Sequence, residues 1–394
     1  MKKLVCVLLV LLLLASTASL TFVATSQWMM KQYEAEMDSD AVKFKMERIK
    51  ALLDTYFIDE YDAEALNAAA ADGAAAAMVT ATGDRWSYYI SASDMEAYDE
   101  QMNNAYVGIG VTIQEAEGGV RIVSVMAGGP AEEAGILPED LCVEVEGQKT
   151  ADLGLDGTKA LVRGEEGTYV NMRFQRNGEF LDLQVQRRTV ITPVAEWEML
   201  EDDIAWITIF NFDAHCAEQT LNCIDEALAQ NARALLFDVR FNGGGYKDEM
   251  VLILDELLPE GDIFRSVDYE GNVDLDTSDA DCLEIPMAVL VNASSYSAAE
   301  FFAAALREYE AAVVVGEQTV GKGYFQTTYQ LSDGSAVALS IGKYFTPKGV
   351  SLAETGVTPD VVALVDEEEA AEIYYGTLTP EEDPQIQAAI KALN

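Results

Sequence analysis

The pattern of hydrophobic and polar positions divides the chain into segments of different periodicity. The first 30 residues begin with two lysines, and an apolar run extends from Leu4 to Leu14 and stays mostly apolar to Val23. Such a run is typical of an export signal, either a cleaved signal peptide or an uncleaved single-span anchor. The apolar residues beyond the small side chains at 16–18 favour the anchor, so residues 1–30 are expected to enter a membrane.

A helical period follows over residues 31–100, with apolar side chains at Met46, Ile49 and Leu52 and an alanine-rich run from Ala68 to Ala77. This spacing predicts a small helical segment. We interpret the segment as an arm without chemistry of its own, used for packing or for homo-oligomer formation.

Short alternating runs dominate residues 101–190, and glycine, proline and Asn-Gly turns separate them. The pattern predicts a compact β-rich module. Its strand-like runs read VGIGVTI, VRIVSVM, YVNMRFQ and LDLQVQ, and the segment GGPAEEAGI predicts a helix that begins at Pro130.

Strand-like and helix-like runs alternate through residues 191–365. This alternation predicts an α/β core with a mixed, partly parallel sheet. The expected strands are DIAWITIFNF, ALLFDVR, PMAVLVN and AVVVGE, and the expected helices cover about 217–229, 250–258 and 297–311. Residues 366–394 form an acidic tail that is expected to be helical at its end. The whole is therefore predicted to be an α/β and β protein.

Charge and cysteine content narrow the classes of function. The 394 residues carry 25 lysines and arginines against 68 aspartates and glutamates, a net charge of −43. So acidic a surface repels phosphate backbones, which argues against a nucleic-acid partner. Outside the export segment the cysteines show no C-x-x-C spacing, so buried free thiols are expected and a structural zinc site is not. These four cysteines are Cys142, Cys216, Cys223 and Cys282.

Candidate chemistry lies in two segments, VNASSYSAAE at 291–300 and GKGYFQ at 321–326. Ser297 follows an apolar strand and begins a helix, the position of a nucleophile at a strand-to-helix turn, although a serine there also serves as a helix cap. A serine nucleophile needs a base, and the chain has one histidine, His215. If His215 is not the base, a lysine must serve, and burial can lower the pKa of Lys322 enough. Gln326 could orient the lysine amine.

The glycines of FNGGGY, residues 241–246, leave backbone amides unobstructed. This suits an oxyanion hole and equally a phosphate-binding loop. The Lys-Ser/Thr ending of a P-loop is missing, and GIGVTI lacks the third glycine of a dinucleotide fingerprint, so nucleotide binding is set aside and no cofactor or metal is expected.

These motifs together resemble the carboxyl-terminal processing peptidases, also called tail-specific proteases, over nearly the whole chain. That family's NxxSASASE motif is matched by NASSYSAAE, its GKG motif with a following glutamine by GKGYFQ, and its DLRxNxGG motif by DVRFNGGG. Further agreement comes from DRWSYYI at 84–90, GVTPD at 356–360 and DPQIQAAIKAL near the end. Tyr296 and Ala299 depart from the family pattern beside the serine.

The resemblance implies a serine endopeptidase outside the cytoplasm that cleaves protein substrates at their C-terminal regions without a metal or cofactor. It assigns the nucleophile to Ser297, the base to Lys322 and assistance to Gln326. It gives the oxyanion hole to the amides of Gly244, Gly245 and Ala298. Residues 101–190 resemble a PDZ domain, and its carboxylate-binding loop corresponds to Gly108, Ile109, Gly110 and Val111, which implies binding of substrate C-termini.

Two alternatives stay open at this point. One is a catalytically inactive PDZ-containing scaffold that binds peptides. The other is a hydrolase that uses His215 or a cysteine, although packing and capping explain His215 and Cys216 more simply. The expected location is the cell membrane, single-pass with an extracytoplasmic catalytic region, or alternatively secreted or periplasmic.

Overall fold

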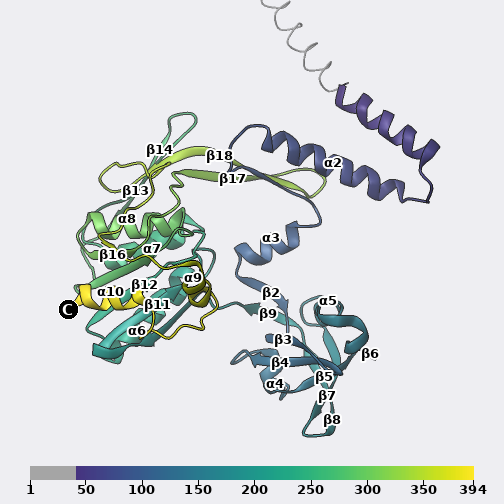
Figure 1. Ribbon diagram of the computed structural model, residues 1–394, viewed down its shortest axis with the longest axis horizontal. Coiled ribbons are helices and arrows are strands. Elements are labelled where there is room, and N and C mark those ends of the chain that lie inside the picture. The colour runs from purple at the N-terminus through teal and green to yellow at the C-terminus, as the bar shows by residue number, and fades with distance from the viewer. Residues whose placement is uncertain (1–40) are drawn as a thin grey trace, which may run out of the picture. The chain divides into compact units, whose positions relative to one another are not determined.

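Two units make up the chain in the computed structural model, which describes residues 41–394. The first unit ends at Met78; its described part is helical over 41–56 and again from the start of α2 (Ala63–Thr80), as the sequence predicts (Figure 1). The expected export segment, residues 1–30, lies outside the described residues. Within 41–394, no helix has the length and apolar character needed to cross a membrane.

The second unit, Val79–Asn394, begins with a segment that the helical pattern describes only in part. A short strand, β1 (Tyr88–Ile90), precedes α3 (Met95–Met102) and pairs antiparallel with β18 (Ala336–Phe345). The prediction of an entirely helical segment up to residue 100 is therefore wrong at β1. Three residues carry too little periodicity to reveal a strand whose partner lies far along the chain.

The β-rich module folds as the alternating runs predict. Its sheet has the order β3-β4-β5-β7-β8, with β6 paired to β5, and Ile122, Val145 and Phe174 are fully buried in its core. The paired strands β2 and β9 lie at its two ends. The module consists of β2 (Ala105–Gly108), β3 (Val111–Ala116), β4 (Gly119–Val125), α4 (Pro130–Glu133), β5 (Leu141–Val145), β6 (Gln148–Lys149), α5 (Thr150–Val162), β7 (Tyr169–Arg176), β8 (Glu179–Gln186) and β9 (Arg188–Ile191).

A six-stranded mixed sheet forms the centre of the α/β core, which confirms the predicted architecture. Its order is β10-β11-β12-β15-β16-β19, and every neighbouring pair is parallel except β10 with β11. The strands are β10 (Ala195–Met199), β11 (Ile204–Ile209), β12 (Ala234–Asp238), β15 (Met287–Val291), β16 (Ala312–Gly316) and β19 (Val361–Val362), and a 3-10 turn, Glu201–Asp203, joins the first two.

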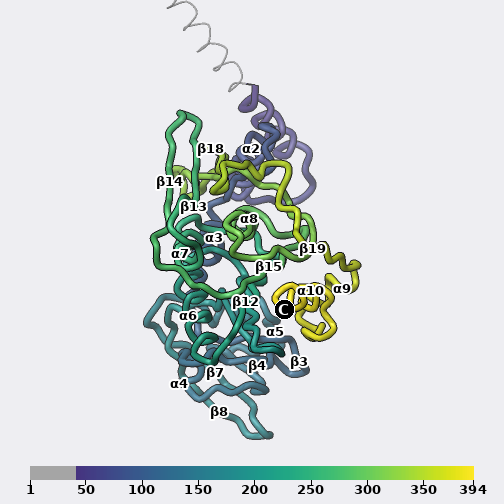
Figure 2. The backbone as a smooth tube through the Cα atoms, turned by 90° about the vertical axis from the view of Figure 1, so that its left-hand side faces the viewer, coloured from purple at the N-terminus to yellow at the C-terminus, as the bar shows by residue number. Residues whose placement is uncertain are grey.

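Helices cover both faces of this sheet. One face packs Leu235, Phe237 and Val289 against α6 (Cys216–Ala229), α7 (Lys247–Leu257) and α8 (Ala298–Glu308). The opposite face packs Leu236 and Leu290 against α10 (Pro384–Leu393), which lies beside β12 in Figure 2. The central strands are consequently buried on both sides, as their continuous apolar runs predict. A short helix, α9 (Glu367–Tyr374), precedes α10.

A second, antiparallel sheet completes the core, and most of it escapes the sequence analysis. It has the order β1-β18-β13-β14, with β17 paired to β18, and Phe264 and Tyr344 pack on Phe301 of α8. The strands β13 (Gly261–Asp268), β14 (Val273–Ser278) and β17 (Tyr324–Gln330) carry so many polar residues that their alternation is weak.

Candidate active site

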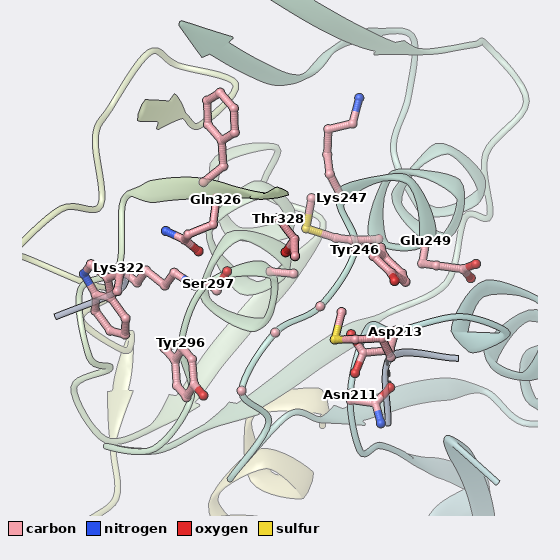
Figure 3. A pocket seen from close by; sticks show the side chains of 18 of the residues that line it. Asn211, Asp213, Tyr246, Lys247, Glu249, Tyr296, Ser297, Lys322, Gln326 and Thr328 are labelled. Atoms are coloured by element: carbon pink, nitrogen blue, oxygen red, sulfur yellow. Dashed lines mark hydrogen bonds between the residues drawn. The ribbon is translucent and has the colours of Figure 1, made fainter. Parts of the chain in front are cut away.

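The candidate residues lie at one edge of the mixed sheet, because they follow the carboxyl ends of adjacent parallel strands. Asp213 follows β11, the glycine loop 241–246 follows β12, Ser297 follows β15 and Lys322 follows β16. Parallel α/β sheets bind ligands at this edge. A cavity of about 1670 Å³ opens here and is lined by all four segments, as well as by residues of β1, α3 and β17 (Figure 3).

Ser297 occupies the sharp turn between β15 and α8. Its backbone is in the left-handed region, with φ 61° and ψ −123°. A non-glycine residue adopts this conformation only where its surroundings enforce it, and such residues concentrate at functional sites. The turn presents the hydroxyl to the cavity at the N-terminus of α8, as the strand-to-helix interpretation predicts.

The buried carboxylate of Glu300 connects the serine turn to the lysine loop. Oε2 accepts hydrogen bonds from the backbone N–H groups of Ser297 (3.1 Å) and Lys322 (2.8 Å). Oε1 accepts from Gly321 N (2.6 Å) and Thr319 Oγ1 (2.5 Å). Burial raises the pKa of Glu300, while these four donors act in the opposite direction. One side chain therefore fixes both backbones at a common point.

Lys322 carries its amine into an aromatic enclosure. Nζ lies 5.1 Å from the ring centroid of Trp86 and 5.8 Å from that of Tyr296, and the two rings stack at 5.8 Å. Burial lowers the pKa of Lys322 to about 8, against the negative charges of Asp84 and Glu300, which raise it. An amine with this pKa is available as a base near neutral pH. Nζ and Ser297 Oγ line the same cavity but do not hydrogen bond to each other among the described contacts.

Gln326 takes part in a chain of polar contacts that ends beside the lysine. Its Nε2 donates to Ser340 Oγ (3.0 Å) and to the Tyr324 carbonyl (3.2 Å), so it does not hydrogen bond to Lys322 in this structure. Ser340 N donates to Ser87 Oγ (2.9 Å), which donates to Asp84 Oδ2 (2.6 Å). Asp84 and Gln326 are thereby connected around the lysine amine.

The glycine loop lies directly against the serine turn. A Cβ on Gly244 would come within 2.6 Å of Ser297 Cβ, and one on Gly245 within 2.2 Å of the Phe212 carbonyl carbon. The Gly244 N–H donates to Asn242 Oδ1 (2.8 Å). This amide, predicted to donate to the oxyanion, is therefore already engaged in the structure. The amides of Gly245 and Ala298 have no acceptor among the described residues, and they are the two that remain for an oxyanion.

The predicted carboxylate-binding loop of the PDZ-like module lines a separate groove. Gly108, Ile109, Gly110 and Val111 contribute to a cavity of about 290 Å³ together with residues of β3 and α5. Gly110 has φ 74°, and a Cβ there would press within 3.3 Å of Met126. A glycine is required because the loop turns sharply at this point. The helix α5, which borders the groove, escapes the sequence pattern because Gly154 and Gly157 interrupt its period.

The alternative nucleophiles and bases do not lie in the large cavity. The four described cysteines are free, and burial raises the pKa of Cys216 to about 12, which makes its thiolate scarce. His215 caps α6 with φ 72° and does not line the cavity. No cluster of histidine, cysteine, aspartate and glutamate that could hold a metal occurs between residues 41 and 394.

Some residues of the site received no role from the sequence. Trp86 and Asp84 belong to the segment interpreted as an arm without chemistry, and that interpretation is wrong here because the segment encloses the lysine. Glu300 had a usable signal: Ser297 and Glu300 have the S-x-x-E spacing of a capping box. Tyr296, noted in the sequence only as a departure from the family pattern, forms one wall of the lysine enclosure.

Comparison with known proteins gives consistent matches. The model of peptidase family S41 matches residues 203–363, and the PDZ domain model matches residues 107–186. A carboxy-terminal processing protease CtpA of Bacillus subtilis is 32% identical over 295 residues, 74% of this chain and 63% of that protein. A probable CtpA-like serine protease of Staphylococcus haemolyticus is 30% identical over 363 residues, 90% of this chain and 71% of that protein.

Among solved structures, the photosystem II D1 C-terminal processing protease is 26% identical. The match covers 80% of this chain and 85% of that chain, with a TM-score of 0.46. The chain spans just under two thirds of the length of the Bacillus relative and somewhat more of the staphylococcal one.

Proposed function

The chain belongs to peptidase family S41, and from this premise we propose that it is a serine endopeptidase with Ser297 as nucleophile and Lys322 as base. The observation that carries the proposal is the buried amine with a pKa of about 8 whose backbone shares one carboxylate oxygen with the backbone of Ser297. A neutral amine held at this place can accept the serine proton, which a surface lysine cannot do at neutral pH.

Each bond change follows from these positions. Neutral Lys322 takes the hydroxyl proton of Ser297 while Oγ attacks a peptide carbonyl, and the amides of Gly245 and Ala298 donate to the oxyanion that forms. The C–N bond then breaks, and the ammonium of Lys322 gives its proton to the leaving amine. A water, deprotonated by the same amine, hydrolyses the acyl-enzyme. The Gln326 carbonyl orients Lys322 once substrate has brought the amine and hydroxyl into contact.

A paired set of variants tests the dyad. Ser297→Ala and Lys322→Ala are expected to lose cleavage of an unstructured protein such as casein, and a fluorophosphonate is expected to label the parent at Ser297 only. Ser294→Ala and Lys343→Ala are matched controls, since both side chains are exposed and neither has a role in the dyad. Cleavage by folded Ser297→Ala at the parental rate would reject the assignment, and absent labelling of the parent would favour an inactive scaffold.

We further propose that the PDZ-like groove binds the C-terminal carboxylate of the protein substrate. The groove that the loop from Gly108 to Val111 lines supports this, because PDZ domains bind a C-terminal peptide as an added strand beside such a loop. Peptides with a free C-terminus are expected to bind, and the same peptides with an amidated C-terminus are expected to bind much more weakly. Equal binding of the two forms in calorimetry would contradict the proposal.

Export and assembly complete the proposed function. The apolar run in residues 1–30 supports an extracytoplasmic catalytic region that is anchored in the membrane. Exposed apolar side chains in the helical arm, such as Phe44, Tyr56 and Ile58, support a homo-oligomer contact. Protease accessibility in intact cells tests the first, and sedimentation of the chain with and without residues 41–60 tests the second.

A further inference from the structure

One acidic side chain in the large cavity has no role in the dyad and no partner. Asp213 follows β11 and is only 5% exposed, and its backbone forms ordinary turn contacts with Asn211 and Cys216. Its carboxylate neither accepts a hydrogen bond nor pairs with a cation among the described residues. A buried carboxylate without a partner is costly, so its position in a binding cavity calls for an explanation.

The surroundings of Asp213 are aromatic. Tyr88, Tyr98 and Tyr246 line the cavity beside it, and the rings of Tyr88 and Tyr98 meet edge to face at 6.5 Å. The carboxylate is close enough to raise the pKa of Tyr88 and of Tyr246, for both of which burial is the larger cause. The neutral phenols present ring surfaces that attract a cation, and the carboxylate supplies the opposite charge.

The neighbouring charged groups are either engaged or exposed, as Asp99 is. Lys247 pairs with Asp276 (2.8 Å) and Asp248 (3.1 Å), and Glu249 Oε2 accepts from Ala217 N (2.7 Å). Asp213 therefore remains as the buried negative charge in the cavity that no protein group neutralises. Burial raises its pKa to about 7, and an approaching cation would offset this because opposite charge favours the ionised form.

The position of Asp213 relates it to the scissile bond. A Cβ on Gly245 would lie 2.5 Å from Asp213 N, so the backbone of Asp213 borders the loop whose Gly245 amide is proposed to hold the oxyanion. Ser297 and Lys322 lie on one side of the cavity, and Asp213, Tyr246 and Glu249 lie on the other (Figure 3). A peptide substrate that extends from Ser297 past the glycine loop would place one of the side chains near its scissile bond beside Asp213.

We propose that Asp213, with Tyr88, Tyr98 and Tyr246, forms a subsite for a lysine or arginine side chain of the protein substrate, close to the cleaved bond. This inference rests on the proposed peptidase function and adds a specificity that the dyad does not determine. The subsite selects substrate by pairing its cation with a buried carboxylate of the cavity wall that has no partner within the described chain.

A scanned peptide series tests the inference. Peptides with a mapped cleavage site carry lysine or norleucine at each of the three positions on either side of the bond, with one constant C-terminus. At one position lysine is expected to raise kcat/KM about tenfold or more over norleucine, and Asp213→Asn is expected to bring this ratio near one. No preference at any position, or a preference that survives in Asp213→Asn, would overturn the inference.

Matched variants separate the possible failures. Asp248→Asn removes the same charge from an 84% exposed side chain of the same cavity, and its ratio is expected to stay within about twofold of the parent. If Asp213→Asn does not fold, Tyr98→Leu serves instead, and loss of one ring is expected to lower the ratio about two- to fivefold. A parent that cleaves norleucine peptides without preference refutes the subsite alone, whereas a parent that cleaves none refutes the peptidase proposal as well.

Discussion

Replacing Lys322 by methionine should make the protein more stable at neutral pH. Methionine has a similar length and no charge, and the lysine amine lies in an aromatic enclosure where burial disfavours its protonated form. The folded protein gives up the proton of Lys322 near pH 8, whereas an unfolded lysine holds it to its ordinary pKa of 10.5. The unfolded state therefore binds more protons between these values, and this destabilises the fold.

The size of the effect follows from the two pKa values. Their separation lowers the free energy of unfolding by about 3 kcal/mol, and this full penalty applies below pH 8. The penalty declines as the pH rises from 8 to 10.5 and falls to about 1 kcal/mol at pH 10. Lys322→Met is thus expected to exceed the parent by about 3 kcal/mol at pH 7 and by clearly less at pH 10.

Urea unfolding of parent and variant at pH 7 and pH 10 measures the double difference, in which all other titrating groups cancel. Lys343→Met is the control, because it removes the same charge from an exposed lysine outside the aromatic enclosure. A Lys322→Met protein that is less stable than the parent at pH 7, or whose advantage is the same at both pH values, would refute the reasoning about the buried amine.

The other predictions concern the groups around the dyad. The kcat/KM of the parent should rise with pH with a midpoint near pH 8 and level off above it. Trp86→Ala should move this midpoint upward by exposing the amine; a midpoint unchanged in the variant would count against the enclosure. In Glu300→Gln a single carboxamide oxygen remains to accept from the four donors that the carboxylate now holds. Fluorophosphonate labelling of Ser297 should therefore largely disappear, and the free energy of unfolding in urea should fall by about 2 to 4 kcal/mol. Asp383→Ala leaves Arg240 short of a buried partner and should lower stability by about 3 to 5 kcal/mol; a loss under about 1 kcal/mol would show that the pair does not hold the tail.

Elements whose own residues carry a clear hydrophobic or turn pattern could be predicted from the sequence. The buried strands before Ser297 and Lys322 are continuous apolar runs, and the serine turn and the glycine loop follow them directly, so the edge of the sheet could be predicted. The pattern also gave the α/β core and the β-rich module.

Contacts between distant segments could not be predicted in this way. The enclosure of Lys322 by Trp86 depends on β1 pairing with β18, and neither segment signals the other. The engagement of the Gly244 amide by Asn242 depends on a side-chain rotamer, which no spacing reveals. The same holds for Asp213, whose significance lies in the absence of a partner within the described structure.

The C-terminal segment of the described chain is held against the strand edge that carries the glycine loop. Arg240, between β12 and the glycine loop, donates to Asp383 Oδ2 (2.7 Å) and Gln385 Oε1 (3.0 Å), while Ile386 and Ala389 of α10 are buried on the sheet. Removal of residues 383–394 would thus remove these contacts to the segment that carries Gly245 and expose an apolar surface of the sheet.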